Sequence, residues 1–305
     1  MNLCIATRKS PLALWQAHWV GAQLENLGAT VRYHALTTKG DLWLENRLAP
    51  QGGKGLFVRE LEEAVLSGEA DLAVHSMKDL PFYFPEGLGL VAITERLDPE
   101  DAFVSPQYPN LAALPRGARV GTASLRRQVQ VRVKRPDLEV SVLRGNVGSR
   151  LEKIQSGQVD AAVMAAAGLK RLGLEQHIKQ TFTVQESIPA IGQGALGIEC
   201  RIADKGLCDL LRQLQHRPTA AAVIAERAFG QALGTQCGHA VGALGQVQGD
   251  RLLLTVWVGQ PSTLETLELQ LEGAVSEAIV LGQTAAQQLI AQGALRLLGI
   301  ASDVG

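Results

Sequence analysis

The sequence has few aromatic residues and almost no excess of charge of either sign. Phe, Trp and Tyr together make up 4% of its 305 residues, and the formal net charge is −1. Proteins whose main task is nucleic-acid binding usually carry a basic excess, with aromatic side chains interleaved among the basic ones. The composition therefore argues against a nucleic-acid partner.

Cysteine clusters and long apolar runs are also missing. Cys4, Cys200, Cys208 and Cys237 show no CxxC spacing and have no histidines clustered beside them, so we expect no disulfide framework, no bound metal and a reducing compartment. No apolar run approaches the roughly 18 residues that span a bilayer, and the N-terminal residues lack the apolar core of a signal peptide. We accordingly expect a cytoplasmic protein without a membrane partner.

The overall composition is that of an ordinary folded protein. Hydrophobic residues make up 46% of the chain and charged residues 19%. At 305 residues the chain is too long for one typical hydrophobic core. The length therefore predicts two or three domains.

The N-terminal part has the pattern of an α/β unit. Residues 3–6 are predicted as a buried strand, followed by a helix with Ser10 at the N-cap and Pro11 at the first helical position. Residues 31–36 are predicted as the next strand. This arrangement places Arg8 and Ser10 at a strand-to-helix turn, where a cation and a hydroxyl favour anion binding.

A glycine-rich loop is predicted after the second strand. Residues 41–55 have no hydrophobic periodicity, and residues 52–55 read Gly-Gly-Lys-Gly. The run lacks the Ser or Thr and the glycine spacing of a phosphate-binding loop, so we reject a nucleotide site and expect a mobile loop. A helix over residues 56–67, with Phe57 on its apolar face, is predicted to follow.

Polar side chains then follow a short apolar strand at residues 72–74. Within five residues come His75, Ser76, Lys78 and Asp79. Pro81 prevents a helix from continuing through this point and favours extended backbone at Leu80. Open α/β sheets build active sites at such strand ends, although this cluster taken alone is equally compatible with an ordinary polar loop.

The second part of the chain places arginines after successive predicted strands. Strands are predicted at residues 119–121, 139–143 and 161–164, each followed by a turn and a helix, and the arginines are Arg126, Arg127, Arg144 and Arg150. One such arginine is most often a solvated surface charge. Four at the same edge of a parallel sheet, with Arg8, predict a cleft lined by guanidinium groups that grip carboxylates or phosphates.

Two further segments complete the predicted organisation. Residues 187–200 are predicted as a loop feeding a strand that returns to the first unit, as in hinged two-unit binding proteins. A third, α+β domain is predicted from a helix at 219–233, strands at 241–247, 252–258 and 264–269, and a helix at 275–290. The predicted domains are residues 1–95 with 195–213, residues 100–190, and residues 217–305.

Cys237 lies in a glycine-rich turn between a predicted helix and a predicted strand. A lone cysteine is most often a small buried hydrophobic residue. Its place on a turn, away from any periodic apolar position, favours a use for the sulfur.

Six short segments occur in one order over nearly the whole chain: residues 6–13 (ATRKSPLA), 53–57 (GKGLF), 75–81 (HSMKDLP), 121–127 (GTASLRR), 143–147 (LRGNV) and 192–194 (GQG). Together they resemble the porphobilinogen deaminase (hydroxymethylbilane synthase) family, and the third domain resembles it through residues 225–229 and Cys237. The resemblance implies two periplasmic-binding-protein-like (type II) α/β domains flanking a cleft, plus a small C-terminal α+β domain.

The resemblance also implies a reaction. Such a transferase joins four porphobilinogen molecules head to tail, releases ammonia each time, and frees the linear tetrapyrrole hydroxymethylbilane to water. It uses a dipyrromethane cofactor held by a thioether, here implied at Cys237. Porphobilinogen is then the substrate, uroporphyrinogen-III synthase is the partner that takes the product, and a monomer is expected.

Roles for individual residues follow from the same resemblance. Asp79 is implied as the catalytic carboxylate, which stabilises developing positive charge and moves protons. The implied cofactor-binding residues are Cys237 (covalently), Ser76, Lys78, Asp79, Thr122, Ser124, Arg126, Arg127 and Gln193. The implied substrate-binding residues are Arg8, Ser10, Phe57, Arg144, Arg150 and Arg171, and Phe57 with residues 52–55 is implied to form a movable lid.

The chain departs from the family pattern around the implied anchor. Thr235 and Gln236 precede Cys237 where the family typically has two glycines, and Ala240 stands in the place of a proline. A hinged binding protein for a polycarboxylate ligand, without catalysis, is the alternative function. It explains the cleft and the arginines equally well.

Overall fold

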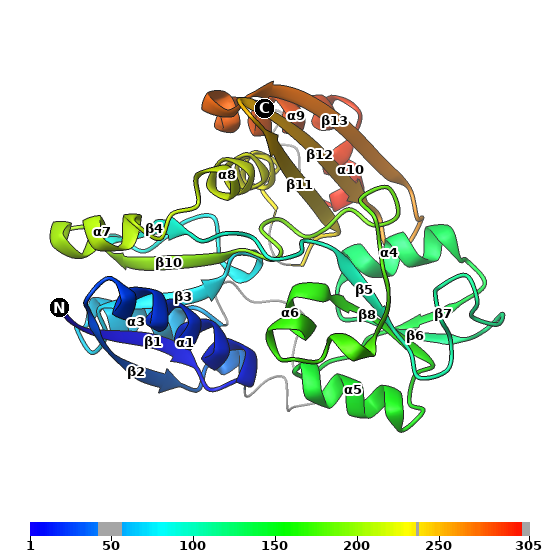
Figure 1. The fold of residues 1–305 in the computed structure, drawn as a ribbon. Helices are drawn as coiled ribbons and strands as arrows, with labels where there is room; N and C mark the ends of the chain where they lie inside the picture. The colour runs from blue at the N-terminus through cyan, green and yellow to red at the C-terminus, as the bar shows by residue number, and fades with distance from the viewer. Residues whose placement is uncertain (42–56, 236–237, 301–305) are drawn as a thin grey trace. The chain divides into compact units, whose positions relative to one another are not determined.

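The computed structural model describes residues 1–41, 57–235 and 238–300 (Figure 1). Within it the chain forms two compact units. Unit 1 comprises residues 1–97 and 194–220, and unit 2 comprises residues 98–193 and 221–305. Most of the predicted loop at 41–55 lies outside the described residues.

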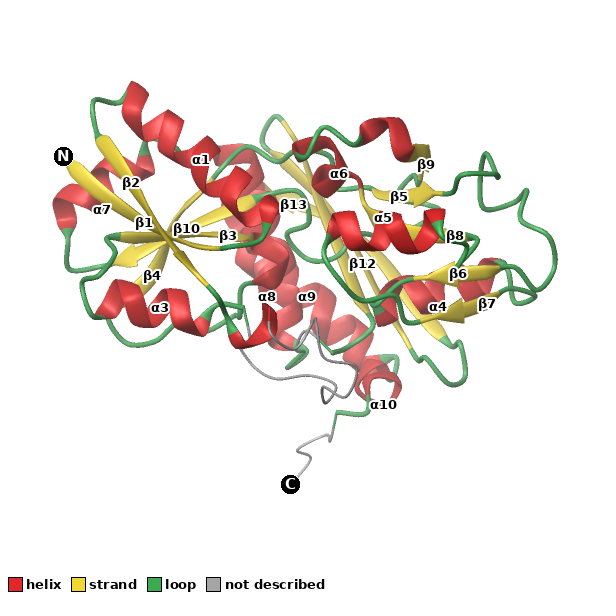
Figure 2. Cartoon of the chain, turned by 90° about the horizontal axis from the view of Figure 1, so that it is seen from below, coloured by secondary structure: helices red, strands yellow, loops and turns green. Residues whose placement is uncertain are grey.

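Unit 1 is a five-stranded sheet covered by helices on both faces. Its strands are β1 (Asn2–Arg8), β2 (Thr30–Leu36), β3 (Leu72–Ser76), β4 (Leu88–Ile93) and β10 (Leu196–Arg201), in the order β2-β1-β3-β10-β4. Its helices are α1 (Pro11–Asn26), α3 (Arg59–Leu66) and α7 (Lys205–Arg212). Apolar side chains of α1 and α7 pack on one face and those of α3 on the other. Figure 2 shows the helices on these two faces.

Unit 2 repeats this plan. Its strands are β5 (Asp101–Val104), β6 (Arg119–Gly121), β7 (Glu139–Ser141), β8 (Ala161–Ala165) and β9 (Ile178–Thr181), in the order β7-β6-β8-β5-β9. Its helices are α4 (Leu125–Lys134), α5 (Val147–Gln155) and α6 (Ala166–Arg171). In both sheets the fourth strand, β10 or β5, is antiparallel to both neighbours. Each is the first strand after the chain passes from one unit to the other.

The C-terminal part is a three-stranded antiparallel sheet with helices packed against it. The strands are β11 (Val241–Gln248), β12 (Arg251–Gly259) and β13 (Thr266–Ala274), and the helices are α8 (Arg217–Ala232), α9 (Ala278–Ala291) and α10 (Ala294–Leu298). Fully buried side chains such as Phe229, Val256 and Leu289 form its core. The predicted fold class, two α/β sheets plus a small α+β part, is therefore confirmed. The predicted boundaries of three domains stay a prediction.

Two predicted elements begin later than expected. The helix predicted at 56–67 begins at Arg59, because Val58 before it has a non-helical backbone with φ −120°. Phe57 lies in the turn that precedes the helix. The strand predicted from residue 264 begins at Thr266, since Leu264 has a left-handed backbone with φ 61°. Local turn geometry, which apolar spacing does not report, decides both boundaries.

Candidate active site

Arg8, at the end of β1, is held by two partners within unit 1. Its Nε donates to Asp41 Oδ2 at 3.3 Å, its Nη2 pairs with Asp41 Oδ1, and its guanidinium carbon lies 4.1 Å from the centre of the Phe57 ring. Thr38 Oγ1 donates to the same carboxylate at 2.7 Å. Burial alone raises the pKa of Asp41, but the hydrogen bonds from Arg8 and Thr38 outweigh it and hold the pKa below its usual value. Sequence reasoning missed Asp41, which gave no signal beyond opening a glycine-rich stretch.

Ser10 caps the helix that follows Arg8. Its backbone is extended, and its hydroxyl accepts from the Ala13 N–H at 3.3 Å, as predicted for an N-cap. Pro11 is the first helical residue. The turn therefore presents a guanidinium and a hydroxyl at the start of a 16-residue helix, a favourable place for an anion.

The segment from Ser76 to Asp79 leaves the sheet as a single 3₁₀ turn, Met77–Asp79. Ser76 Oγ accepts from Gln16 Nε2 at 2.8 Å, and the buried Met77 donates its N–H to Ala195 O at 3.0 Å. Leu80 returns to extended backbone before Pro81, as predicted. Asp79 is exposed, while Ser76 and Met77 before it are held by these hydrogen bonds. The backbone that carries the Asp79 carboxylate is therefore fixed in position.

His75 has a different environment from Asp79. It is 5% exposed, and its Nε2 lies 2.9 Å from Glu199 Oε2 on the neighbouring β10. The side chain therefore contacts the interior of unit 1.

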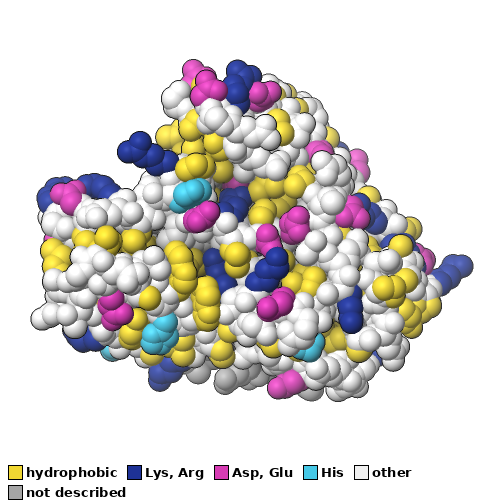
Figure 3. Space-filling model, in the orientation of Figure 1, with side chains coloured by type: hydrophobic (Ala, Val, Ile, Leu, Met, Phe, Trp, Pro, Cys, Tyr) yellow, Lys and Arg dark blue, Asp and Glu magenta, His cyan; other side chains and the backbone are white. Residues whose placement is uncertain are grey.

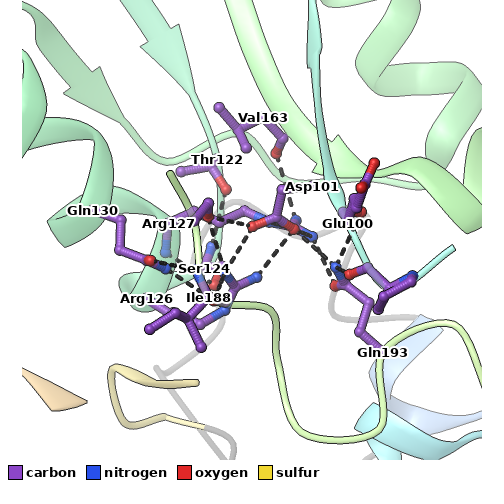
Figure 4. A network of polar contacts seen from close by, with 12 residues as sticks. Glu100, Asp101, Thr122, Ser124, Arg126, Arg127, Gln130, Val163, Ile188 and Gln193 are labelled. Atoms are coloured by element: carbon purple, nitrogen blue, oxygen red, sulfur yellow. Dashed lines mark hydrogen bonds and ion pairs between the residues drawn. The ribbon is translucent and has the colours of Figure 1, made fainter. Parts of the chain in front are cut away.

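In unit 2, Arg126 and Arg127 share one buried carboxylate, that of Asp101 at the start of β5 (Figure 4). Arg126 contacts it at two points, Arg127 Nε donates to Oδ1 at 2.9 Å, and Gln193 Nε2 donates to the same oxygen at 2.9 Å. Burial raises the pKa of Asp101, but the two guanidinium groups outweigh it and hold the pKa far below its usual range. Burial lowers the pKa of Arg126. Asp101 is the second residue that sequence reasoning missed, because nothing in the acidic stretch at residues 98–101 (Asp-Pro-Glu-Asp) singles it out.

Thr122 and Ser124 shape the start of α4. Ser124 is the N-cap and accepts from the Arg127 N–H at 3.5 Å, while Thr122 Oγ1 accepts from the Ser124 N–H at 3.3 Å. The helix begins at Leu125, so Thr122 and Ser124 lie in the turn before it. The hydroxyls, the helix N-terminus and Arg127 are thus neighbours along one short stretch.

The remaining predicted arginines also lie in unit 2. The strands β6, β7 and β8 are parallel, so the turns that follow them meet at the same edge of the sheet. Arg144 precedes α5, Arg150 lies within it, and Arg171 ends α6. Arg171 is buried, and this burial lowers its pKa to about 10. Gly145, beside Arg144, has φ 121°, a conformation that favours glycine, and Asn146 caps α5.

Cys237 lies outside the described residues, as do residues 52–55. The positions beside the cysteine where the sequence departs from the family are partly described. Thr235 Oγ1 donates to Gly230 O at 2.8 Å, and Ala240 is buried against Val129, Ile188 and Trp257. Ala240 is therefore a packing residue.

Three properties of the described part of the chain bear on function. No group of three or more His, Cys, Asp or Glu side chains could hold a metal ion there. None of the described helices is both long and apolar enough to cross a membrane. On the face drawn in Figure 3, basic and acidic side chains are interspersed, in agreement with the net charge of −1.

The fold is that of a protein with two α/β units of one plan, with arginines placed at strand ends where such sheets bind ligands. The chain belongs to the porphobilinogen deaminase family. Residues 3–209 match the family model for the porphobilinogen deaminase dipyromethane cofactor binding domain, and residues 220–291 match the model for the porphobilinogen deaminase C-terminal domain. The predicted family and cofactor are confirmed, and the family implies a transferase of tetrapyrrole biosynthesis.

Solved structures with a similar chain path are distant binding proteins. A putative methionine-binding lipoprotein from Bacillus subtilis has a TM-score of 0.44 at 13% identity, over 70% of this chain and 90% of that chain. A nutrient-binding protein from Burkholderia cenocepacia bound to methionine has a TM-score of 0.43 at 15% identity, over 68% and 89%. The aliphatic sulphonate binding protein SsuA from Escherichia coli has a TM-score of 0.41 at 13% identity, over 76% and 70%. No functional conclusion follows from likenesses at this level.

The residues around α4 fit an acidic cofactor. Two buried guanidinium groups share the single carboxylate of Asp101, which leaves one positive charge in excess. Arg126 Nε is also buried without a hydrogen-bond partner among the described atoms. A carboxylate-bearing group beside this helix N-terminus balances that charge.

Proposed function

We propose that this chain condenses four porphobilinogen molecules head to tail, with loss of ammonia at each step, and then releases hydroxymethylbilane by hydrolysis. The family match over nearly the whole chain supports this proposal. The observation that carries it is the placement of Asp79, exposed at the end of β3 on a turn that Ser76 and Met77 anchor.

In unit 1 we assign Asp79 the catalytic role. Loss of ammonia and formation of the carbon–carbon bond both create positive charge on pyrrole groups. A fixed carboxylate stabilises that charge and can carry a proton between the leaving amine and the pyrrole carbon. Arg8 and Ser10 are assigned to a substrate carboxylate. The Phe57 ring, whose centre lies 4.1 Å from the guanidinium carbon of Arg8, holds that guanidinium in place.

In unit 2 we assign the start of α4 to the cofactor. Arg126, Arg127, Thr122 and Ser124 would hold its carboxylates, with Gln193 hydrogen-bonded to Arg127. Ser76, Lys78 and Asp79 stay assigned to the same cofactor, as the family resemblance implies. Arg144, Arg150 and Arg171 are assigned to substrate carboxylates. When bound through Cys237, the dipyrromethane supplies the primer to which new rings are added. A monomer in the cytoplasm, with uroporphyrinogen-III synthase as the enzyme that receives the product, completes the proposal.

Intact-mass measurement of the purified protein tests this function. We expect a two-pyrrole adduct, its absence in Cys237→Ser, and its retention in the control Cys208→Ala, since Cys208 is buried. Further rings should add when porphobilinogen is supplied. Unmodified protein that binds porphobilinogen reversibly and releases no ammonia would instead identify a binding protein.

A further inference from the structure

Three ionisable side chains lie in the apolar layer between α3 and the sheet of unit 1. They are Glu62 on α3, His75 on β3 and Glu199 on β10, with exposed fractions of 8%, 5% and 0%. Figure 2 shows α3 against this face of the sheet, where Leu61, Ala64 and Val65 supply the apolar contacts. Ionisable groups are costly in such a layer, and none of the roles assigned above uses Glu62 or Glu199.

The cluster contains two carboxyl groups and one imidazole. His75 Nε2 and Glu199 Oε2 are 2.9 Å apart, so the imidazole contacts one of the two carboxyl groups. Glu62 Oε1 and Glu199 Oε1 are buried without a hydrogen-bond partner among the described atoms. An ionised carboxylate in that state is much less favourable than a protonated one. Burial first, and then the charge of Glu199, raise the pKa of Glu62 to about 7, against the opposing effect of His75.

The other charged groups on the elements around Glu62 are engaged elsewhere. On α3, the exposed Glu63 pairs with Arg59, and Glu60 accepts the Lys39 N–H at 2.9 Å. The groups on the packed strands are Arg201 on β10, which donates to the Val65 and Ala70 carbonyls, and Arg8 on β1, which pairs with Asp41. Within residues 1–41 and 57–235, these neighbouring charges are therefore paired with other groups and not with Glu62, His75 or Glu199.

The cluster lies directly behind the segment that ends in Asp79. Ser76, Met77 and Lys78 separate His75 from Asp79, and the four residue steps between them correspond to roughly 9 Å of chain rise. Glu62 is in the first turn of α3, five residues after Phe57, whose ring stacks on Arg8. Asp79 thus follows β3, which carries His75. Phe57, whose ring lies against Arg8, precedes α3, which carries Glu62.

We infer that Glu62, His75 and Glu199 form a buried proton switch behind Asp79, in which loss of the Glu62 proton to solvent adds a negative charge that favours the cationic steps of the reaction. This inference rests on the proposed function. Glu62 and Glu199 act through space and through the strand and helix that they join, and they form no bond to substrate. One unit charge at roughly 10–15 Å, at an effective dielectric constant between about 20 and 40, changes a rate by roughly two- to fifteenfold.

The first test is the pH profile of kcat for porphobilinogen. In the wild type we expect kcat to rise between about pH 6 and pH 8 through a group with a pKa near 7. Glu62→Gln keeps the shape and stays uncharged, so it should lack this step and remain roughly two- to fifteenfold slower at pH 8. Glu62→Asp should restore the step, and Glu63→Gln, exposed on the same helix, should keep the wild-type profile. A wild-type profile in Glu62→Gln overturns the inference.

The second test needs no turnover. A carboxylate whose pKa is raised by folding stabilises the fold below its unfolded pKa and loses that contribution as the pH rises through about 7. In urea, Glu62→Gln should therefore unfold at a higher midpoint than the wild type at pH 8, and this advantage should shrink towards pH 5. Identical pH dependence of the two proteins overturns the assignment of the proton, whether or not the chain is an enzyme. A further outcome is a protein that shows the expected stability difference but never turns over porphobilinogen. That result would confirm that Glu62 carries the titrating proton, and it would overturn both the proposed function and the catalytic part of the inference.

Discussion

Arg126 contacts the carboxylate of Asp101 at two points, with 2.7 Å between Nη1 and Oδ2 and 3.1 Å between Nη2 and Oδ1. The same Nη1 donates to Ile188 O at 2.6 Å, so the ion pair also holds the segment before Gln193. Asp101 lies on β5, and Glu199, the partner of His75, lies on β10. The antiparallel strand of each α/β unit thus carries a fully buried carboxyl group that contacts a basic side chain on a neighbouring element.

Asp101→Asn should destabilise unit 2 strongly, because it leaves two buried guanidinium groups without a counter-charge. Removing one partner of such a pair typically costs about 3–5 kcal/mol, measured as the free energy of unfolding in urea. Because the pKa of Asp101 is depressed, its contribution is present above the unfolded pKa and is lost as the pH falls, so the deficit should shrink below about pH 4. Glu265→Gln, which breaks the exposed pair with Arg296, is the control and should change stability far less. An equally small effect of Asp101→Asn would contradict the account of the buried network.

Asp79→Asn should separate cofactor loading from turnover. The amide has the shape of the carboxylate but neither its charge nor its proton-carrying ability, so we expect kcat to fall by roughly 10²–10⁴ while the two-pyrrole adduct stays in the intact mass. Asp209→Asn, an exposed change on α7, is the control. Near-normal turnover in Asp79→Asn would remove its catalytic assignment.

Sequence reasoning located the strands and one helix cap, because apolar runs and caps are local signals. The strand at Arg119–Gly121 and the cap at Ser10 agree with it. The partners Asp41 and Asp101 were missed, because each lies more than 20 residues from the arginine that it binds and follows no periodic pattern. Pairing across a sheet is set by tertiary packing, which spacing in one sequence does not encode.

Arg8→Lys should weaken substrate binding more than the chemical step. Lysine keeps the charge but loses the two-point contact with Asp41 and the stacking on Phe57. We expect KM for porphobilinogen to rise roughly tenfold, with kcat changed much less. Arg212→Lys, which is exposed on α7, should leave both constants unchanged. A drop in kcat at constant KM would instead place Arg8 in the chemical step.

The three described cysteines should resist alkylation in the folded protein. Cys4, Cys200 and Cys208 are buried thiols, and burial, with the hydrogen bond to Cys208, raises the pKa of Cys200 to about 12. At pH 8 only roughly one Cys200 side chain in 10⁴ is then the reactive thiolate. Brief treatment with iodoacetamide should leave all three unmodified in the peptide masses, whereas the same treatment in urea should modify each of them. Fast labelling of Cys200 in the native protein would contradict the packing of β10 against α7, since that contact is what buries the thiol.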